Sequence, residues 1–200
     1  MSNLSTDVDN LKQNYREIFI RVSEEFNRKT ANMSEDEFSK FVKEDFLKEA
    51  YEIQLKISQS RRKFTCKNCG VCCKLACSEF SPDELQQKAQ RGDDFAQQFL
   101  SVFVPYKDEN YPEKIYPEYF KLLQEKLQGE NVYFYYCPKV TKDNLCPDYE
   151  NRPQICRDFP DNPLGFLPKS CGFLKWKEEV EADALKLHAI LEIARFFIND

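Results

Sequence analysis

Residues 64–73 read FTCKNCGVCC and hold four of the nine cysteines in this 200-residue chain. Two residues separate Cys66 from Cys69 and Cys69 from Cys72, and Cys73 follows directly. This spacing lets a tight turn aim successive sulfurs at one point, as in zinc knuckles and iron–sulfur loops. Five basic residues and no acidic residue lie between Arg61 and Cys77. Basic neighbours lower thiol pKa values and offset thiolate charge, so the segment favours metal ligation.

Cys77 follows shortly after this motif, and four further cysteines occur much later, in a segment rich in proline. They are Cys137, Cys146, Cys156 and Cys171, and prolines stand at 138, 147, 153, 160, 163 and 168 between them. Loops of this kind form no periodic hydrophobic core. A metal site that ties them down replaces the missing stabilisation, because metal-binding free energy then becomes folding free energy. The fold is therefore expected to depend on the group that the cysteines bind.

The donor set is dominated by thiolates, because the chain has a single histidine, His188. We expect His188 to be a half-buried helix residue and not a ligand. Thiolates select soft partners, which are zinc, iron–sulfur clusters and copper(I). Eight thiolates complete two four-cysteine sites and leave one spare. The neighbouring side chains of Cys72 and Cys73 are expected to diverge and to serve different sites, unless one of them is not a direct ligand.

Composition excludes several classes of function. Lys and Arg number 29 against 34 Asp and Glu, a net charge of -5, which argues against general nucleic-acid binding. No apolar run approaches the roughly 20 residues that span a bilayer, and the polar N-terminus is not a secretory signal. Glycine spacing matches no phosphate-binding loop. With an odd number of cysteines and no export signal, we expect free thiols and a cytoplasmic location.

The flanking segments predict helices. Apolar residues recur at helical spacing over 11–26 and 38–57, and capping boxes begin at Ser34 and Ser81. Further helices are expected over 82–91, 93–103 and 117–128, with a strand over 132–136. A long C-terminal helix is predicted from about residue 173, and its expected buried stripe consists of Trp176, Val180, Ala184, Leu187, Leu191, Ala194 and Ile198.

The expected fold is mostly α, with a cysteine-rich, loop-dominated, metal-stapled centre and at most a short β-hairpin. Three parts are predicted: an N-terminal helical hairpin over 1–60, a cysteine module over 61–171, and a C-terminal helix over 172–200 that packs on the module. Two arginines invite alternative interpretations. Arg152 and Arg157 either hydrogen-bond a thiolate or cluster sulfide, or pair with the acids at 148, 150 and 158.

Two motifs together resemble a known family. CxxCGxCC at residues 66–73 is followed by Cys137-Pro138, Cys146, the segment YENRPQICRDFP at 149–160, and Cys171. This combination is similar to the YkgJ-type cysteine-cluster family, whose signature is CxxCxxCC and which is described as zinc- or iron-chelating. The resemblance implies these ligands: Cys66, Cys69, Cys72, Cys73, Cys137, Cys146, Cys156 and Cys171. Cys77 is not part of the pattern.

The sequence and the resemblance indicate a cytosolic protein that binds metal or an iron–sulfur cluster through thiolates. The cofactor is an iron–sulfur cluster or zinc. An alternative is a structural-zinc module without redox or catalytic activity, which binds a protein partner through its helical flanks. A third is that exposed thiolates chelate or deliver metal ions. No catalytic set is evident around the lone histidine, so whether the protein is an enzyme stays open.

Overall fold

The computed structural model describes residues 4–108, 111–126 and 131–198, and in this part of the chain helices predominate. The mostly α fold class is confirmed. Contacts within the chain define two compact units. A helical unit comprises residues 1–65 and 175–200, and a cysteine unit comprises residues 66–174. The three-part division drawn from the sequence stays a prediction.

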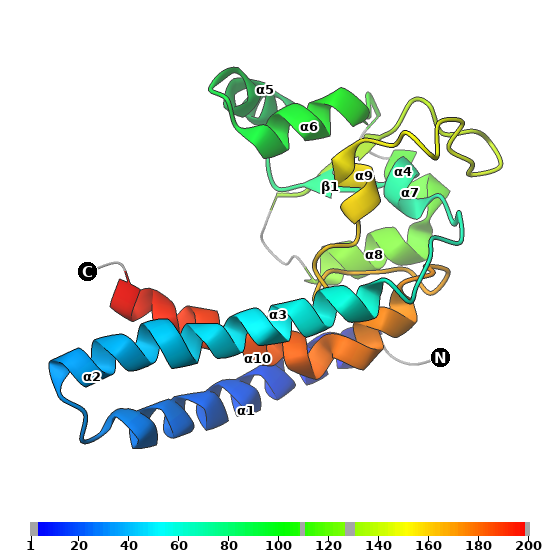
Figure 1. The fold of residues 1–200 in the computed structure, drawn as a ribbon. Helices are drawn as coiled ribbons and strands as arrows, with labels where there is room; N and C mark the ends of the chain where they lie inside the picture. The colour runs from blue at the N-terminus through cyan, green and yellow to red at the C-terminus, as the bar shows by residue number, and fades with distance from the viewer. Residues whose placement is uncertain (1–3, 109–110, 127–130, 199–200) are drawn as a thin grey trace. The chain divides into compact units, whose positions relative to one another are not determined.

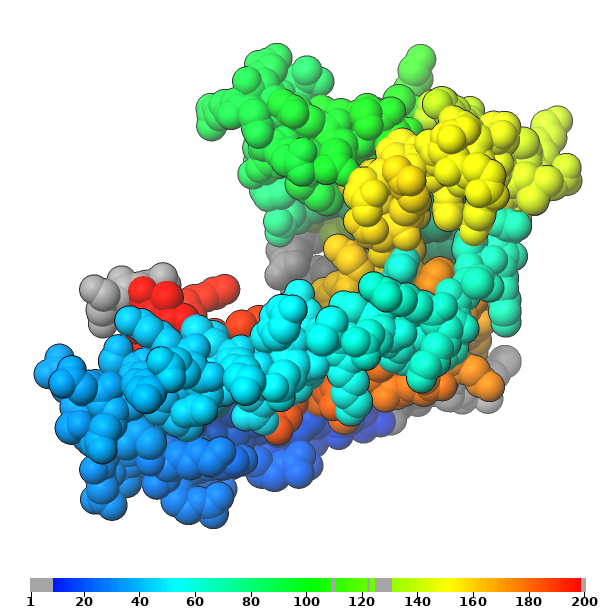
Figure 2. Space-filling view, viewed as in Figure 1, coloured from blue at the N-terminus to red at the C-terminus, as the bar shows by residue number. Residues whose placement is uncertain are grey.

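The helical unit contains α1 (Leu4–Thr30), a continuous run of α2 (Glu35–Lys40), η1 (Phe41–Phe46) and α3 (Leu47–Arg61), and α10 (Leu174–Ile198). These three stretches lie side by side (Figure 1) and are in contact in the space-filling view (Figure 2). Their shared core consists of Val22, Phe26, Val42, Phe46, Ala50, Ala189, Ile190, Ile193 and Ala194. α10 thus completes a core that α1 and α3 begin.

The capping box at Ser34 forms as the sequence predicts. The Ser34 hydroxyl accepts the N–H of Glu37, and the Glu37 carboxylate accepts the N–H of Ser34 at 2.9 Å. One turn later the helix widens into the π-helix η1, which the apolar periodicity gives no sign of. Val42 and Phe46 of η1 are both buried, so the widened turn still faces the core.

The predicted stripe of α10 is wrong at two positions. Leu191 is 48% exposed and Ile198 is 54% exposed, whereas Ile190 is fully buried. The predicted Ala194 is fully buried and Leu187 packs against the core, so the buried face is wider than the predicted stripe and is not shifted from it. α10 also buries Leu185 on another side, since it packs against more than one helix.

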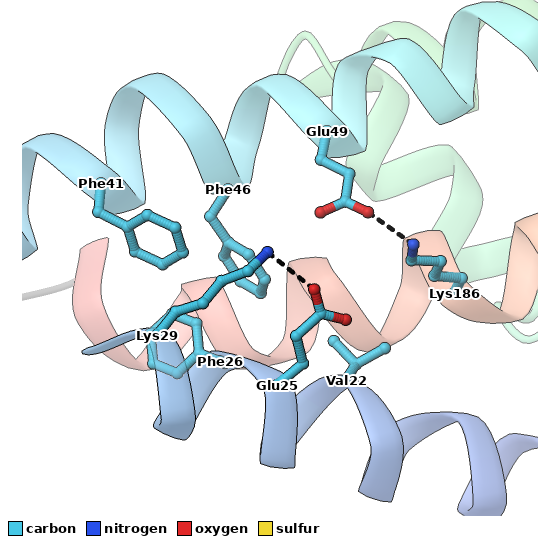
Figure 3. A pocket seen from close by; sticks show the side chains of 8 residues that line it. All are labelled: Val22, Glu25, Phe26, Lys29, Phe41, Phe46, Glu49 and Lys186. Carbon is cyan, nitrogen blue, oxygen red and sulfur yellow. Dashed lines mark ion pairs between the residues drawn. The ribbon is translucent and has the colours of Figure 1, made fainter. Parts of the chain in front are cut away.

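Charged side chains cover a shallow hollow on the helical unit (Figure 3). Lys29 pairs with Glu25 at 2.8 Å, and Lys186 pairs with Glu49 at 2.6 Å. Beneath them lie apolar side chains of the core. The hollow is thus lined by core side chains beneath a rim of two ion pairs.

The cysteine unit is built around a three-stranded antiparallel sheet of order β1-β3-β2. β1 (Ala76–Ser78) and β2 (Val104–Pro105) pair with the two sides of β3 (Tyr133–Tyr136). β3 fulfils the predicted strand, whereas the two partner strands are too short to show in the sequence. A small core of Leu85, Ala96, Phe99 and Tyr135 packs against the sheet.

Short helices surround this sheet. They are α4 (Val71–Lys74), α5 (Pro82–Gln90), α6 (Asp94–Val102), α7 (Tyr111–Ile115), α8 (Pro117–Lys126) and α9 (Gln154–Asp158). The capping box at Ser81 is confirmed. The end of the helix predicted over 117–128 lies outside the described residues. Within the described ranges, no helix is long and apolar enough to cross a membrane.

Candidate metal centre

The first four cysteines lie on a turn and the short helix that comes after it. Asn68 and Gly70 adopt left-handed conformations, with φ of 54° and 75°, and α4 then begins at Val71. These two reversals compact the chain, so that Cys66 and Cys69 precede α4 on a tight turn. Asn68 N–H also donates to the Cys66 sulfur at 3.3 Å. The side chain of Asn144 lies against Gly70, in the place that a Cβ would occupy.

Cys72 and Cys73 lie closer together than the sequence suggested. Their sulfurs are 4.0 Å apart, so the expectation that neighbouring side chains diverge is wrong in this helical turn. As acceptor of a hydrogen bond from the Cys72 thiol, Cys73 has a pKa lowered to about 7, and the cations of Arg152 and Lys74 act in the same direction. The pKa of Cys72 is raised, because it donates that bond and is buried.

Cys69 and Cys171 form a second sulfur pair across a long sequence separation. A hydrogen bond from the Cys171 thiol lowers the pKa of Cys69 to about 6, and the N–H of Val71 and the hydroxyl of Ser170 also favour the thiolate. The same bond and burial raise the pKa of Cys171. At neutral pH one sulfur of this pair is therefore a thiolate and the other a thiol. In the absence of a metal ion, this arrangement avoids two adjacent negative charges.

The remaining predicted ligands approach α4 from the proline-rich segment. Cys137 N–H donates to the carbonyl oxygen of Cys73 at 2.7 Å, directly after β3 ends. Cys156 lies on α9, and burial raises its pKa to about 11, with further contributions from the charges of Cys73, Cys137 and Cys146. The thiols of this second group are thus within electrostatic reach of one another.

The contacts of Arg152 are with Tyr149, and differ from both expected roles, a hydrogen bond to a sulfur and an ion pair with a nearby acid. Its Nε donates to the carbonyl oxygen of Tyr149 at 3.1 Å, and its guanidinium lies 3.7 Å from the centre of the Tyr149 ring. Its charge nevertheless lowers the pKa of Cys73 and of Cys156. The cation is therefore placed to compensate thiolate charge.

Two residues lie outside the predicted ligand set. Cys77 is exposed on β1, where it is paired in register with Phe134. His188 belongs to the helical unit and is exposed, which corrects the expectation of a half-buried residue; its Nδ1 lies 3.0 Å from the Tyr15 hydroxyl. Neither observation adds a ligand to the cysteine set.

Tyrosine hydroxyls anchor the backbone around the cysteines, a feature that sequence reasoning missed. Tyr106 donates to the carbonyl oxygen of Lys74 at 2.6 Å, and Tyr116 donates to that of Cys69 at 3.0 Å. Tyr119 donates to the carbonyl oxygen of Phe166 at 2.9 Å. The abundance of tyrosine is the only sequence signal for these hydrogen bonds, because no spacing rule links a hydroxyl to a distant carbonyl group.

The donor chemistry fits a soft metal or a cluster. All nine cysteines are free, and each of the eight predicted ligands is partly buried. Among the residues that the structure describes, no three Cys, His, Asp or Glu side chains are gathered closely enough to hold a metal ion. The sulfurs thus occur in pairs, and further sulfurs have to move closer to such a pair before a metal ion can be bound.

A cysteine-rich, loop-dominated domain of this kind is typical of cysteine-ligated metal-binding modules. Residues 65–181 match the family model CxxCxxCC, described as "Putative zinc- or iron-chelating domain". Since the match covers more than half of the chain, the protein belongs to this family. No curated protein and no solved structure matched the chain.

Proposed function

We propose that the protein binds zinc or an iron–sulfur cluster through eight cysteine thiolates, and that this binding holds its cysteine unit together. The ligands are Cys66, Cys69, Cys72, Cys73, Cys137, Cys146, Cys156 and Cys171. One observation carries the proposal. From Cys137 to Phe159, all described, no side chain is buried, and the only regular element is the five-residue helix α9.

A segment of this length without buried side chains has little hydrophobic stabilisation to offset its loss of conformational entropy. Its cysteines are nevertheless partly buried, and the backbone of Cys137 is hydrogen-bonded to that of Cys73 in α4. Metal–thiolate bonds supply the missing free energy, as they do in small zinc domains. The free thiols also support a reducing, cytosolic location.

The first experiment is metal analysis of anaerobically purified protein, with an absorption spectrum of the same sample. Matching iron and sulfide with a broad visible band indicates a cluster, and a colourless sample with stoichiometric zinc indicates a structural metal. Hydrogen exchange before and after chelation then tests the role in folding. We expect residues 137–159 to lose protection on chelation, with the amides of α1 and α3 as the internal control. A protein that holds no metal contradicts the proposal.

The second candidate is a structural-zinc module that binds a protein partner through its helices and has no redox activity. Exposed apolar side chains on α10 favour it: Phe196 is 72% exposed, and Ile198 and Leu191 are also exposed. Single exposed apolar residues are common, so this observation counts for less than the cysteine segment. A zinc-loaded, redox-silent protein whose partner binding is abolished by Phe196→Ser supports this candidate.

A further inference from the structure

We propose that Asn144 is a positioning residue of the metal centre, an inference that rests on the metal-binding function proposed above. Its side chain holds the loop over residues 137–146 against α4, the short helix that carries Cys72 and Cys73. Asn144 is not a cysteine and lies outside the predicted ligand set. It therefore acts on metal binding through the position of the loop and not as a ligand.

The loop forms a closed turn by its own hydrogen bonds. Thr141 N–H donates to the carbonyl oxygen of Leu145 at 3.0 Å, and Leu145 N–H donates to the Thr141 hydroxyl at 3.0 Å. Asn144 N–H donates to the carbonyl oxygen of Thr141 at 3.1 Å. Asn144 has a left-handed conformation, with φ of 64°, which asparagine adopts at less cost than most residues. The turn thus places the Asn144 side chain two residues before Cys146.

The Asn144 side chain contacts both ends of α4. At the end of the helix, Lys74 Nζ donates to Asn144 Oδ1 at 2.5 Å, and this bond is partly buried. At the start, the side chain of Asn144 occupies the space where a Cβ of Gly70 would lie. The carbonyl oxygen of Gly70 accepts the N–H groups of Cys73 and Lys74, so Gly70 begins the helical turn. One asparagine side chain therefore holds this helix at both of its ends.

The other end of the loop is attached to the same helix through the backbone. Cys137 N–H donates to the carbonyl oxygen of Cys73 at 2.7 Å. No side chain is buried between Cys137 and Phe159, and Leu145 is 49% exposed. Hydrophobic burial therefore does not fix the loop against α4, and polar contacts decide its position.

The bond to Asn144 also gives one basic residue of the cysteine motif a specific role. The five cations between Arg61 and Cys77 are expected from the sequence to compensate thiolate charge. The Lys74 ammonium is in addition directed at the amide oxygen of Asn144 in the facing loop. A charge-assisted hydrogen bond is stronger than one between neutral groups, and partial burial reduces its screening by water.

The consequence of this attachment is a smaller loss of entropy on metal binding. Two of the proposed ligands, Cys137 and Cys146, lie on the loop, and a loop that is attached near both ends has fewer conformations to lose when they bind. Removal of the Asn144 amide leaves every thiol in place. The affinity for metal should therefore fall while the number of ions bound stays the same.

Competition for zinc between a chelator and the full-length protein tests this role. Asn144→Gly removes the amide but allows the positive φ. We expect its zinc dissociation constant to rise about tenfold, the effect of one lost hydrogen bond to a charged group. Asn144→Asp keeps an oxygen acceptor for Lys74 and should bind zinc as tightly as the wild type. Asn151→Gly is the matched control, because Asn151 is exposed on the same segment and its amide donates to Asp148.

Two further readouts separate positioning from ligation and from general folding. The zinc stoichiometry, and the thiolate-to-metal absorption per ion of the cobalt-loaded protein, should be unchanged in Asn144→Gly, because no ligand is lost. Hydrogen exchange of the zinc-loaded variant should be faster over residues 137–145 and unchanged in α1 and α3. Lys74→Met should weaken zinc binding to a similar extent, and combining it with Asn144→Gly should weaken binding no further, because both remove the same bond.

Equal zinc affinities of Asn144→Gly and the wild type overturn the positioning role, and so does a failure of Asn144→Asp to restore the affinity. A lower zinc stoichiometry in Asn144→Gly also overturns it, since the residue then decides whether a site forms at all. These results leave metal binding by the wild-type cysteines intact. A wild-type chain that binds neither added zinc nor native metal overturns the proposed function itself.

Discussion

The N–H of Cys137 donates a 2.7 Å hydrogen bond to the carbonyl oxygen of Cys73, so the end of strand β3 is fixed to the helix that carries the CxxCxxCC motif. This bond joins the two halves of the cysteine pattern through the backbone and needs no metal. The proline-rich segment therefore begins at a defined place beside α4. Under the proposed function, metal ligation only has to order the chain beyond Cys137, which reduces the entropy lost on binding.

Gly70→Ala should accelerate zinc loss to a chelator and lower thermal stability. The substitution adds a Cβ where Asn144 lies, at a residue with φ of 75°. Gly92→Ala is the matched control, because Gly92 has φ of 89° but no atom within 4 Å of the added Cβ. Both variants bear a backbone cost of about 1–2 kcal/mol, and only Gly70→Ala also displaces Asn144. Equal zinc-loss rates in the two variants would contradict this account.

Tyr116→Phe should weaken the cysteine unit by about 1 kcal/mol, since it removes the hydroxyl that donates to the carbonyl oxygen of Cys69. Urea denaturation of the zinc-loaded protein measures the change. Tyr51→Phe is the control, because Tyr51 is 65% exposed on α3 in the helical unit. An unchanged unfolding midpoint for Tyr116→Phe, with Tyr51→Phe also unchanged, would show that the hydroxyl is not a structural anchor.

In the reduced, metal-free protein, the pH should determine which cysteines are alkylated. The pKa of Cys69 is lowered to about 6, so its thiolate is present above that pH and is lost as the pH falls through it. Cys156, whose pKa is raised to about 11, should stay unreactive at pH 8. Iodoacetamide rates at single cysteines, resolved by mass spectrometry from pH 5 to 10, measure both.

Cys171→Ala provides the control for this titration. It removes the donor that stabilises the Cys69 thiolate, so the midpoint for Cys69 should move up towards about 8.5, the ordinary value for a thiol. Cys77→Ala, on the exposed strand β1, should leave the midpoint in place. The assignment fails when Cys69 titrates identically in both variants.

Ile190→Ala should destabilise the helical unit by about 2–5 kcal/mol, because Ile190 of α10 is fully buried in the core that α10 shares with α1, η1 and α3. Leu191→Ala, one residue further on, replaces a side chain that is 48% exposed and should cost less than about 0.5 kcal/mol. Fluorescence of the single tryptophan, Trp176, reports unfolding in urea, since its ring is fully buried and its Nε1 donates to Ile57 O. A larger loss of stability for Leu191→Ala than for Ile190→Ala would contradict this burial and support the stripe predicted from the sequence.

Local signals in the sequence were sufficient for much of the fold. Serine caps with a glutamate three residues later located the starts of α2 and α5, because both partners of a capping box lie within one turn. The cysteine spacing indicated the family and the soft-metal chemistry, which the family match confirms at the coarser level of zinc or iron chelation.

Relationships between distant residues were beyond the sequence. Cys69 pairs with Cys171, and the hydroxyls of Tyr116 and Tyr119 bind distant backbone carbonyl groups, but no residue pattern encodes these partners. β1 and β2 are too short for an alternating pattern to appear. The proximity of the Cys72 and Cys73 sulfurs depends on the helical turn of α4, which four residues do not reveal in advance.

The helical unit is discontinuous in the chain, since α10 joins α1 and α3 only after the whole cysteine unit has intervened. During synthesis on the ribosome, α1 and α3 emerge with the apolar faces around Phe26 and Phe46 still uncovered. They remain so until more than a hundred further residues have been translated. The newly made chain is therefore expected to depend on chaperones during this interval. A ribosome-bound chain that stops before α10 should be more sensitive to protease in α1 and α3 than the finished protein.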